Sequence, residues 1–216
     1  MVFSVTQNGE KLSKDKYTWD EKTKTFSTTE SNLVLDFSEY DGCTFKTGGS
    51  CTFKTSDDCT FDTGHLCTFD TGDNCTFDTS YDCTFKTGSK CTFKTGGSCT
   101  FKTSDDCTFK TGGYCTFDTG DSCTFDTGSE CTFDTSYDCT FKTGDSCTFK
   151  TGPLCTFKTG DNCVVVRRDV YEVIELKEGQ KIKLKDYQEK GYTIIEEKQK
   201  EEGIIELNGK KYKLIE

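Results

Sequence analysis

The chain has 216 residues, and its 27 Lys and Arg against 37 Asp and Glu residues give it a formal net charge of −10. An acidic balance without a basic stripe argues against a nucleic-acid partner. No segment approaches the roughly 18 consecutive apolar residues of a membrane span, so we expect no membrane partner either. Hydrophobic residues make up only 32% of the chain, which in an ordinary sequence would suggest disorder.

Residues 1–42 are predicted to form an N-terminal β cap. Residues 2–6 and 16–19 have the composition of strands, with turns at 8–9 and 21–22. Residues 35–42 are interpreted as a degenerate first repeat, with Leu35 at the cysteine position and Phe37 at the phenylalanine position. The start of the chain carries neither a basic segment nor a long apolar run, so we expect no secretion signal and a cytoplasmic protein with reduced thiols.

Residues 43–163 form a repeat block in which cysteine recurs at every eighth position. Fifteen octads from Cys43 to Asn162 read Cys-Thr-Phe-Lys/Asp-Thr-x-x-x. Positions one to five alternate between apolar and polar residues, which predicts a short strand with Cys and Phe on one side. Positions six to eight are rich in Gly, Asp, Asn and Ser, where Gly supplies positive φ and the polar side chains bond their own backbone. One such strand has no partner within its own octad, so the block predicts an all-β fold, a parallel β-solenoid.

The charged fourth position favours a 24-residue coil, which is built from three octads and has three strands. At that period, opposite charges lie on neighbouring strands in 11 of 12 pairs, as in the ladder Lys46, Asp70, Lys94, Asp118, Lys142. In the alternative, a two-sided 16-residue coil, opposite charges meet in only 8 of 13 pairs. Like charges directly opposite each other are destabilising, so we favour the larger coil.

The sixteen cysteines are interpreted as core residues. Their regular spacing of one per octad resembles no zinc-binding pattern, and a disulfide between directly stacked parallel strands would be strained. Cys is also a small, readily buried residue with favourable contacts to aromatic edges. Disulfides and a metal or redox role are the weaker alternatives.

Residues 164–216 are predicted to form a C-terminal antiparallel β cap or a small β-domain. Alternating segments occupy 170–176, 181–185, 192–196 and 204–207, and the last pairs with 211–215 across Asn208-Gly209. A solenoid without caps would add end to end into fibres, so we expect both flanks to restrain self-association. An independent partner-binding module is the alternative.

We predict no catalytic, cofactor-binding or metal-binding residues, and no small-molecule substrate is evident. The single histidine, His65, lies in a corner, where we expect it to be exposed to solvent and not catalytic. Acidic corners such as Asp57-Asp58 could bind calcium where coils stack them, but they lack the nonapeptide pattern of calcium β-rolls. Outward threonine columns, which include Thr44, Thr68 and Thr92 at the larger period, would suit ice binding. The neighbouring Lys or Asp column argues against it.

The Cys-Thr-Phe-x-Thr-Gly-x-x units resemble β-solenoid octapeptide-repeat proteins, and more broadly pentapeptide-repeat and other β-helical proteins. The resemblance covers residues 35–166 and implies a fold, with no site residues. Residues 43–58 and 91–106 are identical, which is typical of a recent expansion or an engineered repeat protein. Charges that alternate from coil to coil at the larger period favour engineering. The sequence therefore favours a non-enzymatic structural scaffold, and the alternative is a binding protein, such as an ice binder or an adhesin or fibre segment.

Overall fold

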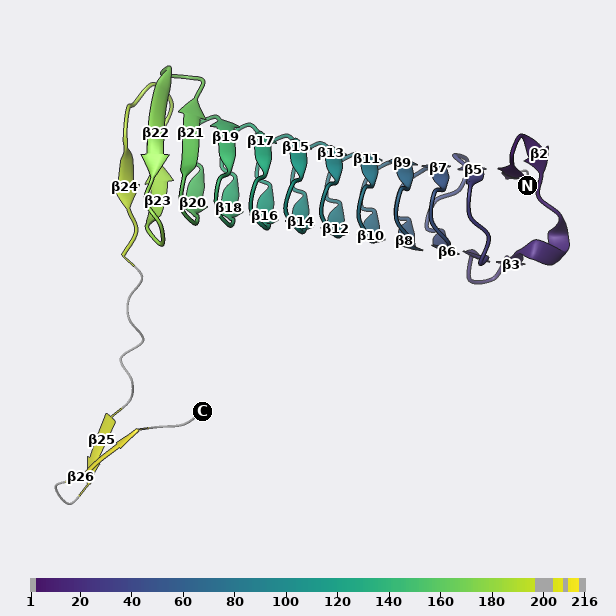
Figure 1. Ribbon diagram of the computed structural model, residues 1–216, viewed down its shortest axis with the longest axis horizontal. Helices are drawn as coiled ribbons and strands as arrows, with labels where there is room; N and C mark the ends of the chain where they lie inside the picture. Colours follow the sequence, from purple (N-terminus) through teal and green to yellow (C-terminus); the bar gives the residue numbers. More distant parts are fainter. Residues whose placement is uncertain (1–2, 197–203, 208–209, 214–216) are drawn as a thin grey trace.

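The structure is a computed structural model that describes residues 3–196, 204–207 and 210–213, and these are almost entirely β-strands and turns. The helix found in the described part is a single 3-10 turn, Lys14–Lys16. Two twelve-stranded sheets run along a straight rod (Figure 1), so the predicted β-solenoid is confirmed. In the described ranges, no helix is long and apolar enough to cross a membrane.

Each sheet contains nine parallel strands, and alternate octads contribute to opposite sheets. Sheet I contains β5 (Leu33–Phe37), β7 (Thr52–Thr55), β9 (Thr68–Asp70), β11 (Thr84–Lys86), β13 (Thr100–Lys102), β15 (Thr116–Asp118), β17 (Thr132–Asp134), β19 (Thr148–Thr151) and β21 (Cys163–Arg167). Sheet II contains β4 (Thr25–Ser27), β6 (Thr44–Thr47), β8 (Thr60–Thr63), β10 (Thr76–Asp78), β12 (Thr92–Lys94), β14 (Thr108–Lys110), β16 (Thr124–Asp126), β18 (Thr140–Lys142) and β20 (Thr156–Lys158).

One coil contains two octads and therefore two strands, so the favoured 24-residue coil is wrong and the 16-residue coil is present. Phe93 pairs in register with Phe77 on one side and Phe109 on the other. The charge pattern favoured the wrong coil size because the charged side chains are exposed, and an exposed ion pair contributes only about 0–1 kcal/mol to stability. The core decides the coil size, since two facing Phe columns already fill the space between two sheets about 10 Å apart.

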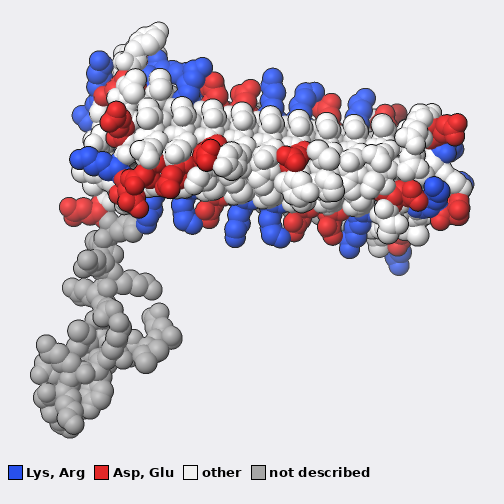
Figure 2. Space-filling model, in the orientation of Figure 1, with Lys and Arg blue, Asp and Glu red and all other residues white. Residues whose placement is uncertain are grey.

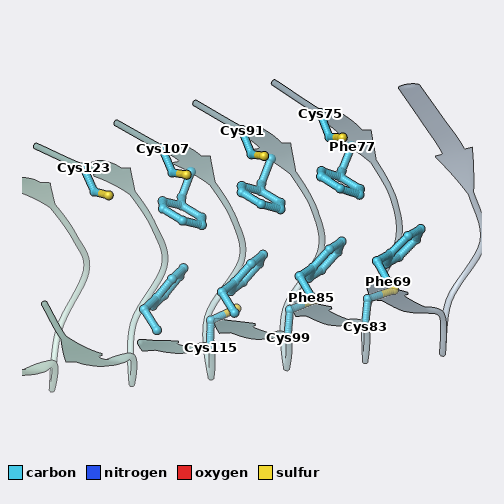
Figure 3. Packing of buried hydrophobic residues seen from close by; sticks show 14 of the residues in the cluster. Phe69, Cys75, Phe77, Cys83, Phe85, Cys91, Cys99, Cys107, Cys115 and Cys123 are labelled. Atoms are coloured by element: carbon cyan, nitrogen blue, oxygen red, sulfur yellow. The ribbon is translucent and has the colours of Figure 1, made fainter. Parts of the chain in front are cut away.

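The interior of the rod is a regular stack of phenylalanine rings. Within a sheet, successive rings are nearly parallel, with 4.8 Å between the centroids of Phe77 and Phe93 and 2° between their planes. Across the coil, Phe85 meets Phe93 edge to face at 5.2 Å and 76°. Both arrangements are favourable for aromatic pairs. Figure 3 shows these rings between two columns of cysteine side chains, all of them buried.

At the N-terminal end, antiparallel strands cover both sheets. In sheet I, β1 (Ser4–Gln7) pairs with β5 and with β2 (Glu10–Lys11), and residues 8–9 form the predicted turn. In sheet II, β3 (Thr18–Asp20) pairs with β4, and residues 21–24 form the turn between them. Strand β3 starts later than predicted, at Thr18, because residues 14–16 form the 3-10 turn. Val2, in the predicted first strand, lies outside the described residues.

The degenerate first repeat is present, but its predicted register is wrong. Leu35 pairs with Phe53, and Phe37 pairs with Thr55. Leu35 therefore takes the phenylalanine position, and Leu33 precedes it at the cysteine position. The turn after β5 is longer than a regular corner, which displaces this strand from the sequence frame of the later octads.

At the C-terminal end, the parallel stack changes to antiparallel pairing. Strand β22 (Glu172–Leu176) pairs with β21, β23 (Lys181–Leu184) with β20, and β24 (Tyr192–Ile194) with β23. A separate two-stranded sheet joins β25 (Ile204–Leu207) and β26 (Lys210–Lys213), as expected from the hairpin pattern. The residues predicted for its turn, Asn208-Gly209, lie outside the described ranges. Fully buried Arg167 donates hydrogen bonds to Asp169 and to the Glu189 carbonyl, tying β21 to the following loops.

Candidate functional site

The two outward faces carry parallel columns of threonine and of charged side chains. Thr76 lies beside Thr92 and Asp78 beside Lys94 on adjacent strands. The Lys94 ammonium and the Asp78 carboxylate are 2.7 Å apart, and both side chains are more than half exposed. Three further pairs of the same kind join Lys86 to Asp70, Lys142 to Asp126, and Lys150 to Asp134.

Like charges also meet on these faces. Lys94 lies beside Lys110 and Asp118 beside Asp134. Figure 2 shows charged side chains projecting from opposite borders of the rod, with largely uncharged surface between them. Charged side chains therefore stand next to the outward threonine columns on both faces.

Positive φ occurs at a different corner position from the one that the sequence predicted. It occurs at position eight of all fifteen octads, with φ between 55° and 63°, and none of these residues is glycine. Position six is glycine in eleven octads and serine in four, and at some of the glycines the coils approach closely. A Cβ on Gly112 would lie 2.8 Å from the backbone nitrogen of Gly97 in the preceding coil. Glycine at this corner therefore avoids a steric clash with the preceding coil.

Position-seven side chains link successive coils. The Asp57 Oδ1 accepts a hydrogen bond from the Asp73 backbone N–H at 2.9 Å, and Asp105 accepts one from Asp121 at 2.9 Å. These carboxylates accept hydrogen bonds from the backbone of the next coil, whereas the sequence suggested bonds to the backbone of their own corner. Among the described residues, no group of three or more His, Cys, Asp or Glu side chains is arranged to hold a metal ion.

The cysteines form two columns of free, buried thiols. The Cys91 thiol donates to the carbonyls of Ser89 at 3.5 Å and Gly72 at 3.6 Å, and other octads repeat this pattern. Burial raises the pKa of the Cys43 thiol to about 11, from an ordinary value of 9.0. A protonated thiol is a weak nucleophile, so the environment of Cys43 favours packing over reactivity.

His65 is exposed in a corner, as expected. Its ring stacks on Tyr81 of the next coil, with 5.2 Å between centroids and 12° between planes. This contact occupies one face of the imidazole. It supplies neither the nucleophile nor the acidic partner that a catalytic histidine would use.

Sequence reasoning placed no site in the N-terminal cap, where the structure has a hollow of about 350 Å³. We call this space the cap hollow, and its lining residues are Trp19, Glu21, Lys24, Glu39, Tyr40 and Asp41. Strand β3 with the turn that follows it supplies the first three, and the turn after β5 supplies the other three. Stacking of the first coils brings these turns together, so the hollow has no local signature in the sequence.

The fold defines the class of protein as a two-sheet parallel β-solenoid built from octapeptide repeats, with cysteine and phenylalanine ladders inside. No protein-family model, curated protein or solved structure matches the chain.

Proposed function

We propose that this protein is a non-enzymatic structural element, a rigid rod of fixed length that is closed at both ends. The observation that carries the proposal is the change from parallel to antiparallel pairing at each end. Strands β1 and β3 cover the first coil, and β22 and β23 cover the last. A regular octad edge is a template for adding further coils, and these antiparallel strands replace it at both ends, so they would set the length of the rod.

Backbone bonding supports a rigid rod. Corner amides bond between coils as regularly as the strands do, as in the bond from Lys90 N–H to the Asp105 carbonyl at 2.9 Å. Bending the rod would stretch such bonds in the strands and in the corners together. The proposal includes a reducing compartment such as the cytoplasm, where the free thiols would persist.

The proposal also includes an origin by recent repeat expansion or by engineering, supported by the identical segments 43–58 and 91–106. The alternation of charges from coil to coil, which favoured engineering, disappears in the 16-residue coil. Lys94 beside Lys110 is one of the like-charge pairs that a designer would avoid.

Truncation of the C-terminal flank tests the closed-rod proposal. A chain that ends at Cys163 would expose the edges of β19 and β20. We expect it to assemble into filaments or aggregates, detected by sedimentation velocity and electron microscopy. A matched control deletes residues 91–106, which removes one coil and keeps both ends, and it should sediment like the parent chain. A truncated chain that stays monomeric at high concentration would refute the capping role.

A further inference from the structure

At the C-terminal end of the rod, two apolar side chains face the core side of sheet II and are nevertheless exposed. In the pairing of β24 with β23, Ile194 lies opposite Ile182, and Tyr192 lies opposite Leu184 in the same way. Directly opposite residues point to the same side of a sheet. Ile182 and Leu184 are buried in the core, whereas Ile194 is 58% exposed and Tyr192 is 36% exposed. The inward side of β24 is therefore only partly covered.

The exposure follows from the unequal ends of the two sheets. Within the rod, an inward side chain of one sheet contacts two of the other, as Phe93 of sheet II meets Phe85 and Phe101 of sheet I. By the same stagger, β24 faces β22 and the place beyond it. In the described part of the chain, sheet I ends at β22, and the outer edge of that strand is unpaired (Figure 1).

The order of the last strands indicates what could fill this place. Strands β21 and β22 form an antiparallel pair in sheet I, and β23 and β24 form the next antiparallel pair in sheet II. The pair that follows along the chain is β25 and β26, which form a sheet of their own. If the alternation between the sheets continued, this hairpin would join sheet I beside β22 and opposite the exposed side of β24.

Strand direction and chain length both permit this placement. Because β22 is antiparallel to β21, and β23 is antiparallel to β20 and to β24, strands β22 and β24 end at the same side of the rod. A strand that starts at that side in sheet I runs antiparallel to β22. The four residues 177–180 already connect sheet I to sheet II there. The nine residues 195–203 could reach about 30 Å, and the sheets are about 10 Å apart.

The composition of the hairpin suits this surface. Three of the four residues of β25 are apolar, and β26 contains three lysines. Strand β22 carries Glu172 and Glu175, so the hairpin and the edge that it would join have opposite charge. An isolated two-stranded hairpin is at best marginally stable in water, so addition to a larger sheet would stabilise it.

We infer that the β25–β26 hairpin docks on this end of the rod, where β25 pairs antiparallel with the free edge of β22 and the hairpin covers Tyr192 and Ile194. The occupant is the hairpin of the same chain, because its short connection to β24 gives it a high effective concentration there. Docking adds a second arrangement of the chain to the one in which β25 and β26 form a separate sheet. The inference rests on the proposed closed rod, and it completes the closure that β22 and β23 begin.

Hydrogen exchange of the full chain, measured by mass spectrometry, tests the docking. Docking gives the outer amides of β22 and those of β25 hydrogen-bond partners, so segments 172–176 and 204–207 should exchange slowly. Leu207→Asp changes the hairpin and leaves the rod untouched. It should release the hairpin and speed exchange in 172–176 by about tenfold, although that segment carries no substitution.

A second variant changes the other side of the contact. Ile194→Asp places a charge on the docking surface and should speed exchange in 204–207 by about tenfold, with unchanged exchange in β23 as evidence that the cap is intact. Val34→Asp is the matched control, because Val34 is 51% exposed on β5 at the other end of the rod. It should leave exchange in both segments as in the parent chain.

The inference is overturned if segment 204–207 of the parent chain exchanges like an unstructured peptide, or if Leu207→Asp leaves exchange in 172–176 unchanged. Protection that appears only at concentrations where dimers sediment would place the hairpin on a second copy, and would overturn docking within one chain. An undocked hairpin on a monomeric chain would leave the closed-rod proposal intact, because β22 and β23 still cover the last coil. Filaments formed by the parent chain would overturn both.

Discussion

Replacement of Phe93 by alanine tests whether the phenylalanine stack holds the rod together. Phe93 is 1% exposed and contacts four other rings. Phe77 and Phe109 lie parallel to it at 4.8 Å, and Phe85 and Phe101 meet it edge to face at 5.2 Å. Loss of a buried phenylalanine costs about 3–5 kcal/mol, through the transfer of the ring and the cavity left behind. Four aromatic contacts place the expected loss toward the upper end of that range.

Chemical denaturation followed by circular dichroism measures this loss as the difference in the free energy of unfolding between the variant and the parent. Thr92→Ala is the matched control, because Thr92 is the exposed neighbour on the same strand and its truncation should cost less than about 0.5 kcal/mol. A loss below about 1 kcal/mol for Phe93→Ala would refute the reasoning, since the interior would then not be packed around the rings.

Three further predictions concern the corners and the thiols. Gly112→Ala should destabilise the rod by about 1–3 kcal/mol, because the new Cβ would meet the Gly97 backbone, whereas Ser104→Ala at the same octad position should be nearly neutral. Both are measured by denaturation, and equal effects would exclude the close-approach argument. Leu66→Asn should raise the thermal midpoint, since Leu66 has a φ of 56° and asparagine adopts that conformation at lower cost; an unchanged or lower midpoint would contradict this. The pKa of Cys43 is about 11 in the folded chain and 9.0 as its ordinary value, so as the pH rises the unfolded chain loses this proton first. The contribution of Cys43 to the free energy of unfolding is therefore present below pH 9 and should be lost as the pH rises from 9 to 11. Denaturation at a series of pH values follows this loss, and a free energy of unfolding that is constant over that range would contradict it.

The sequence predicted the fold class because every octad repeats the same alternation. Phe93 and Cys91 both face inward as that alternation requires, and both are buried. The period of the cysteines also placed each strand close to its observed position. Local pattern is sufficient here because strands and corners are formed by the same short unit fifteen times over.

The coil size could not be predicted from the charges. In the 16-residue coil, Lys86 lies beside Asp70 on one side, which is a favourable pair of opposite charges. On the other side it lies beside Lys102, which is an unfavourable pair of like charges. Both types of pair are exposed, so selection on their energies is weak compared with the burial of one phenylalanine. The charge pattern is the more visible of the two, although it carries the smaller free energy.

The corner geometry and the cap hollow could not be predicted from the sequence either. Glycine at position six suggested positive φ, but the need for glycine at Gly112 comes from the backbone of Gly97 in the neighbouring coil. Trp19 and Tyr40 meet only because β3 and the turn after β5 lie at the same end of the rod. Both features depend on the coil period, which the charge pattern assigned incorrectly.

A crystal structure of the full chain, at a resolution that identifies side chains, tests the two-sheet, 16-residue coil most directly. We predict that the rings of Phe77 and Phe109 will flank Phe93 within its sheet at about 4.8 Å. Finding Phe69 and Phe117 in those places would establish a 24-residue coil and contradict the account.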